Sequence, residues 1–274
     1  MIANILAFTG FTTLLFYWWG LQERFPAGGP VDLDFTVVVF SLIGGVLPAL
    51  LWLWFWLKED AKNPEPRGLI LLSFLAGMAA VPFAIPFEQA AYNMIESQVA
   101  IIFIWSITEE VIKYLAVYLV AFKSRFFDEP VDALIYLITG ALGFAALENS
   151  MYLLNSLIDG GIFVGAINTH LRFLGATLLH VVASSAIGVA IAFSFYKKKN
   201  KAVYVILGII AATLLHALFN LFIIETQNVL ETILVFSYYW LIIIVLIFLF
   251  ERIKIIKQPF PLIQPKPQKY VRER

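Results

Sequence analysis

Three ionisable residues, Glu109, Glu110 and Lys113, interrupt an apolar stretch that runs from about Val99 to Phe122. A stretch of this length can span a bilayer, because ~20 apolar residues cover a hydrocarbon core of about 30 Å. Ionisable side chains at mid-span cost roughly 2.5–3.5 kcal/mol each, so they normally face a protein interior or a cavity and serve a function. A structural ion pair between Glu109 and Lys113, one helical turn apart, is the alternative interpretation. It leaves Glu110 without a partner.

Four polar side chains fall at one depth when the apolar stretches are read as helices. Glu109, Glu148, His180 and His216 each lie well inside a different stretch. At 1.5 Å per residue, counted from the predicted outer end of each helix, all four fall roughly 10–15 Å below the outer surface. Unrelated structural polar residues would be scattered in depth, so this common layer predicts one shared site.

Carboxylates and imidazoles in a membrane cavity suit hydrolysis. Two histidines and a glutamate can bind zinc and leave a position for water, while another glutamate acts as general base. The side chains that could take these roles are Glu109, Glu110, Glu148, His180 and His216. Protonation of buried carboxylates would balance the charge without a metal, so a metal-free mechanism stays open.

The remaining polar residues of this layer are assigned supporting roles. Asn220 lies one turn after His216, where its amide can orient substrate or stabilise an oxyanion. Lys113 counterbalances the glutamates, and Asn149 follows Glu148 directly. The alternative for each histidine is an ordinary hydrogen-bonded packing residue.

The composition indicates an all-α polytopic membrane protein. Hydrophobic residues make up 61% of the chain and charged residues 14%, whereas soluble domains carry about 25% charged residues. Cysteine is absent, which excludes thiol catalysis, thiolate metal ligands and disulfides. Any metal must therefore be held by histidine, glutamate, aspartate or asparagine.

Apolar runs predict about eight transmembrane helices within a single domain, residues 1–250. Their approximate ranges are 2–19, 35–57, 68–87, 99–122, 131–155, 171–196, 202–224 and 229–250. The four helices of about 99–224 form the expected catalytic core. Residues 251–274 are proline-rich and basic, and they form a tail without predicted structure.

Lysine and arginine predict the orientation. Three lie in the loop after the second helix, two after the fourth, four after the sixth, and seven in the tail, against one, Arg24, on the opposite side. The positive-inside rule therefore predicts cytoplasmic N- and C-termini. The site would then lie nearer the extracytoplasmic face.

Four motifs of the core resemble the PrsW family of intramembrane proteases, within the wider group that includes the CAAX prenyl endopeptidases and bacteriocin-processing proteins. They are ITEEVIKY (107–114), GFAALEN (143–149), His180 and HALFN (216–220), in the family's order. The resemblance implies that Glu109 and Glu110 are the essential paired glutamates, with Glu109 activating the water. On this basis the candidate metal ligands are Glu110, Glu148, His180 and His216. It implies metal ligation or oxyanion stabilisation for His216 and Asn220. The prenyl-protease branch carries histidine where this chain has Glu148, so prenylated substrates are not expected.

The implied reaction is site-1 cleavage of a membrane-anchored anti-sigma factor on its extracytoplasmic side, in a prokaryotic plasma membrane. The implied chemistry is either that of a zinc enzyme or that of a glutamic protease. The expected partners are a membrane-anchored protein or peptide substrate and the lipid bilayer, without nucleic acid. A proton- or cation-coupled transporter using the same carboxylates and histidines is the alternative function. A non-catalytic scaffold with a buried polar network is the third hypothesis, and the oligomeric state is left open.

Overall fold

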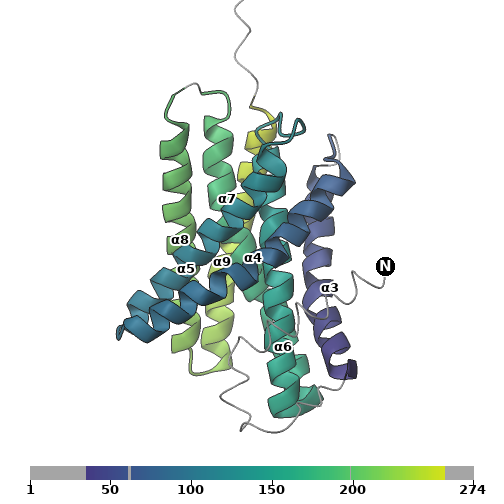
Figure 1. Cartoon of the computed structure of the whole chain (residues 1–274), viewed down its shortest axis with the longest axis vertical. Coiled ribbons are helices and arrows are strands. Elements are labelled where there is room, and N and C mark those ends of the chain that lie inside the picture. Colours follow the sequence, from purple (N-terminus) through teal and green to yellow (C-terminus); the bar gives the residue numbers. More distant parts are fainter. Residues whose placement is uncertain (1–34, 61–62, 198, 257–274) are drawn as a thin grey trace, which may run out of the picture.

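A computed structural model describes residues 35–60, 63–197 and 199–256 of the chain. All regular secondary structure in these ranges is helical (Figure 1). The elements are α3 (Phe35–Glu59), α4 (Arg67–Met94), α5 (Gln98–Val117), the π-helix η2 (Tyr118–Phe122), α6 (Asp132–Leu174), α7 (Ala176–Ser194), α8 (Lys201–Glu225) and α9 (Val229–Lys254).

Seven of the predicted spans correspond to these helices, and the predicted helix at 2–19 lies outside the described residues. Within the described part, six helices are long and apolar enough to cross a membrane. The remaining long helix is α5, whose central residues include Glu109, Glu110 and Lys113. These findings confirm an all-α polytopic membrane protein, while the count of eight spans stays a prediction.

Helix α6 differs most from its predicted range of 131–155, because it continues to Leu174. Residues 156–172 contain three glycines and no proline. Glycine weakens a helix, but only proline both removes a backbone donor and clashes with the preceding turn. The segment expected as a loop is therefore helical, and α7 begins at Ala176 instead of residue 171.

Helix α6 lies at the centre of the bundle and packs against α3, α4 and α7. In its most apolar window 94% of the residues are buried, against 22% for α3 and α9. In Figure 1, α4 and α5 run obliquely across the other helices, which stand nearly upright. Because α6 is central, polar residues on it, such as Glu148 and Asn149, face the interior of the bundle.

Close backbone contact between α4 and α6 depends on glycine. A Cβ atom on Gly77 would collide with the carbonyl of Gly140, and one on Gly143 would collide with the carbonyl of Phe74. Small residues at such crossings let membrane helices approach backbone to backbone. This contact holds α4 against the helix that carries Glu148.

The connections of the bundle alternate between two ends. Figure 1 shows the last turns of α3, η2 and α7, which precede the connections 60–66, 123–131 and 195–200 in the sequence, at the same end as the last turn of α9. These are the lysine- and arginine-rich connections of the sequence. The short connections at 95–97 and 226–228 lie toward the opposite end. This alternation agrees with the predicted orientation, which itself stays a prediction.

Replacement of Gly143 with leucine is expected to separate α4 from α6 and to destabilise the protein, because the new side chain meets the Phe74 backbone. Overpacking of this kind typically costs about 1–3 kcal/mol, or more where only backbone can yield. Thermal unfolding in detergent measures the effect. Gly68→Leu is the matched control, since a Cβ atom at Gly68 meets nothing within 4 Å. Equal melting temperatures for both variants would contradict the proposed packing role.

Candidate active site

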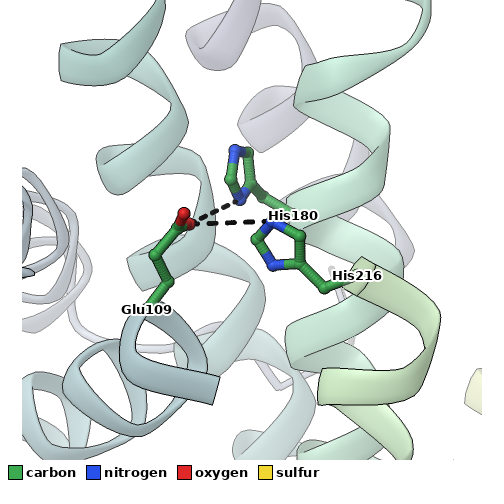
Figure 2. A group of neighbouring side chains, drawn as sticks. All are labelled: Glu109, His180 and His216. Atoms are coloured by element: carbon green, nitrogen blue, oxygen red, sulfur yellow. Dashed lines mark ion pairs between the residues drawn. The ribbon is translucent and has the colours of Figure 1, made fainter. Parts of the chain in front are cut away.

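Three side chains from three helices converge on one point in the bundle. Figure 2 shows Glu109 of α5 facing His180 of α7 and His216 of α8. Glu109 Oε2 lies 3.9 Å from His180 Nδ1 and 3.8 Å from His216 Nε2. The two imidazole rings are 5.2 Å apart between centroids. All three residues are buried, so the cluster is shielded from bulk solvent.

Each histidine is oriented by a second glutamate. His216 Nδ1 lies 2.9 Å from Glu110 Oε1, and His180 Nε2 lies 2.9 Å from Glu148 Oε2. An ionised carboxylate only accepts hydrogen bonds, so each of these nitrogens donates its proton. The other nitrogen of each ring then presents a lone pair toward Glu109. This is the arrangement in which a carboxylate fixes the tautomer of a metal-binding histidine.

Lys113 connects the paired glutamates to His180. Its Nζ atom lies 2.6 Å from Glu110 Oε1, 3.4 Å from Glu109 Oε2 and 3.0 Å from His180 Nδ1. The ammonium also lies 4.4 Å from the ring centre of Phe144 on α6. The ion pair considered from the sequence joined Lys113 to Glu109 and left Glu110 without a partner. In the structure the shorter contact of Lys113 is the one to Glu110. The ammonium serves both glutamates.

Two further hydrogen bonds hold this network in place, and the sequence gave no signal for Ser184 or Thr177. The Ser184 hydroxyl of α7 donates to Glu110 Oε2 over 2.7 Å. Asn149 donates to Thr177 Oγ1 over 2.9 Å, which ties α6 to the first turn of α7. Asn149 is thus placed beside the site, as a contact between helices.

A cavity of about 380 Å³ opens beside the cluster. Glu109, Glu148, His180, His216 and Asn220, all candidate residues from the sequence, line it. Its other walls are largely apolar or aromatic: Ile102, Trp105, Tyr152, Ala176, Leu179, Phe219, Ile223, Ile224 and Phe236. Glu110 and Lys113 lie behind this surface, fully buried. The sequence did not single out Glu88 of α4, a further lining residue.

The donor set fits a divalent metal ion. One ligand atom from each of Glu109, His180 and His216 lies within 4.8 Å of the other two. Two imidazole nitrogens and a carboxylate oxygen are a common set for catalytic zinc, which leaves a fourth position open. Glu110 and Glu148, which the sequence suggested as ligands, contact the other nitrogen of each ring, His216 Nδ1 and His180 Nε2. Lys113 would have to release His180 Nδ1, because that nitrogen has one lone pair.

Comparisons with known proteins point to one family. Residues 65–250 match the family described as "PrsW family intramembrane metalloprotease". The chain is 36% identical to Protease PrsW of Geobacillus kaustophilus over 45% of this chain and 57% of the relative. It is 29% identical to Protease PrsW of Oceanobacillus iheyensis over 65% of this chain and 80% of the relative.

The chain is 27% identical to Protease PrsW of Bacillus subtilis over 69% of this chain and 86% of the relative. The Geobacillus match spans less than two thirds of that relative's length. No solved structure matches the chain.

Removal of the Lys113 ammonium is expected to destabilise the protein strongly. Lys113→Met leaves two buried carboxylates without their cation, and breaking a buried ion pair costs about 3–5 kcal/mol. We expect a large drop in melting temperature in detergent. Lys123→Met, which removes an exposed lysine from the turn after η2, controls for the loss of positive charge. A Lys113→Met protein as stable as wild type would show that the ammonium is dispensable for the fold.

Proposed function

This chain belongs to the PrsW family of intramembrane metalloproteases, and on that premise we propose that its glutamate–histidine cluster hydrolyses a peptide bond of a membrane-anchored protein. One observation carries the proposal. Glu109 and the lone pairs of His180 and His216 meet at one point beside a cavity. Such a point can hold a water molecule next to a substrate carbonyl carbon.

The residues around this point divide into two groups by what they touch. Glu109, His180 and His216 face the reacting water, and Glu110 and Glu148 orient the two imidazoles. Asn220 lines the same cavity, and its amide can donate to the oxyanion that forms when water adds to the carbonyl. Lys113 neutralises part of the negative charge behind the cluster.

We assign Glu109, His180 and His216 as the residues that would hold a metal ion. When bound, a divalent cation such as zinc supplies Lewis acidity, which makes water a stronger acid and polarises a carbonyl. Glu109 is also the carboxylate nearest both lone-pair nitrogens, so it is the residue that accepts a proton from water where no metal takes part. Its loss is damaging in either mechanism.

The reaction would take place near the extracytoplasmic face. Glu109 lies 11 residues after the start of α5 at Gln98, or about 16 Å along the axis. That end of α5 is opposite to the basic connections, which the positive-inside rule assigns to the cytoplasm. A substrate with one membrane span and an extracytoplasmic domain fits this depth. We propose a membrane-anchored regulatory protein of the anti-sigma-factor type.

Glu109→Gln is expected to abolish cleavage while leaving folding intact, because the amide keeps the shape of the side chain but cannot take up a proton. The test co-expresses the protease with a candidate anti-sigma factor tagged on its extracytoplasmic domain, and follows the released fragment by immunoblot. Glu96→Gln, an exposed residue just before α5, is the matched control. Cleavage that persists in Glu109→Gln but fails in an equally folded His216→Ala would remove Glu109 from the mechanism.

Metal content separates the two mechanisms. Zinc is measured by inductively coupled plasma mass spectrometry on detergent-purified protein. We expect about one zinc per chain in the wild type and loss of that zinc in His216→Ala. His216 presents one of the three converging ligand atoms, so its removal leaves two. Ser194→Ala, away from the cluster in the last turn of α7, should keep the metal. An active wild-type preparation without metal would instead support water activation by Glu109 and a histidine.

A further inference from the structure

Glu88 is a third carboxylate on the wall of the catalytic cavity, and no motif of the sequence includes it. It lies on α4, and its backbone carbonyl accepts a hydrogen bond from Trp105 Nε1 of α5 at 2.9 Å. This bond fixes the register between α4 and the helix that carries Glu109. Glu88, Trp105, Glu109 and Glu148 all line the cavity. The position of Glu88 is therefore set by the same helices that build the site.

The other carboxylates of the site are engaged. Glu109 and Glu110 contact Lys113, and Glu148 contacts His180. Among the residues that the structure describes, the carboxyl group of Glu88 has no hydrogen-bond partner, and the bond from Trp105 goes to its backbone carbonyl. Its side chain is free to exchange a proton with a molecule in the cavity. The contacts of the other three carboxylates instead hold the cluster in position.

The charge of the site favours a neutral Glu88. Ionised Glu109, Glu110 and Glu148 together with the Lys113 ammonium carry two negative charges, which one divalent cation balances. An ionised Glu88 would add an uncompensated charge in a membrane cavity, where such charges are costly. It would also be repelled by Glu109 and Glu148, although the Lys113 ammonium, already in contact with Glu109 and Glu110, attracts it. Without a metal the excess of negative charge is larger, so the same preference holds.

Depth places Glu88 between the cluster and the end of the bundle. It lies six residues before the end of α4 at Met94, or about 9 Å along the axis, whereas Glu109 lies about 16 Å from the start of α5. A proton donor at the shallower position can be recharged from the aqueous side. It can also reach the part of a substrate that lies outward of the scissile carbonyl.

We propose that Glu88 is the general acid that protonates the leaving amine. The inference rests on the proposed peptidase function. Water oxygen bonds to the scissile carbonyl carbon, and its proton passes to a carboxylate of the cluster. The carbon–nitrogen bond then breaks, its electron pair goes to nitrogen, and the Glu88 carboxyl proton is transferred to that nitrogen. The proton taken from water returns to Glu88 through the cavity, so the products are a carboxylic acid and an amine.

The proton on Glu88 can be detected without a substrate. A protonated carboxyl group has a carbonyl stretching band in the infrared that an ionised carboxylate lacks. We expect the spectrum of detergent-purified protein at neutral pH to lose one such band in Glu88→Gln and to keep it in Glu96→Gln. Identical bands in wild type and Glu88→Gln would show that Glu88 is ionised, and would overturn the proposal.

The catalytic role is tested by changing the leaving group. A transmembrane peptide that the wild type cleaves at a mapped bond is compared with the same peptide carrying a thioester at that bond. A thiol has a pKa near 8.5, so it leaves as a thiolate and needs no acid. We expect Glu88→Gln to lower kcat for the amide about 100-fold or more, the range of general acid catalysis. KM and thioester turnover should change only a few-fold, and Glu88→Asp should restore part of the amide rate.

The alternative outcomes are distinct. Equal losses on amide and thioester would show that Glu88 supports the site structurally, and a change confined to KM would show that it binds substrate. Either result overturns the proposal. If wild-type protein cleaves neither bond of any tested peptide, the proposed peptidase function fails and the role of Glu88 fails with it, whatever the infrared spectrum shows.

Discussion

The buried ammonium of Lys113 is the contact on which the rest of the site depends. Glu109, Glu110 and Lys113 come from two turns of one helix, and all three are removed from water. Two adjacent carboxylates could not both stay ionised there without a cation within reach, because their repulsion is weakly screened. Lys113 lies 2.6 Å from one and 3.4 Å from the other. Buried ion pairs often add little net stability compared with apolar packing. The value of this one lies in holding two carboxylates in fixed and different positions.

Those fixed positions determine what α7 and α8 can present. Glu110 accepts hydrogen bonds from His216 Nδ1 on α8 and from the Ser184 hydroxyl on α7, so it joins α5 to both helices. Glu148, on the central helix α6, accepts a hydrogen bond from His180 Nε2 and so joins α6 to α7. Each imidazole is thereby turned with one lone pair toward Glu109. The backbone contact of Gly77 with Gly140 holds α4 close to α6, and α4 contributes Glu88 to the wall of the cavity.

Much of this site could be predicted from the sequence, because the rise of a helix is constant and depth follows from counting residues. The common depth of Glu109, Glu148, His180 and His216 needed no tertiary information. Which glutamate faces which nitrogen did need it, since that depends on the rotation of each helix about its axis. Glu110 and Glu148 were expected as ligands, and the structure shows each of them in contact with the histidine nitrogen that does not face Glu109. Ser184 gave no signal, because serine is unremarkable in an apolar helix. Glu88 lies near a helix end, where a carboxylate normally reaches solvent.

The lone pair of His180 Nδ1 links the two mechanisms considered for this family. It accepts a hydrogen bond from Lys113 over 3.0 Å. The same nitrogen lies 3.9 Å from Glu109 Oε2 and so faces the point where a metal could be held. One lone pair has one partner, so an ammonium proton and a metal ion are mutually exclusive there. Lys113 keeps its closest contact, Glu110, in either case. A cation held by this group would therefore replace the ammonium at one imidazole, while Lys113 would keep its contact with Glu110. The same residues can then support both chemistries, and metal occupancy alone distinguishes them.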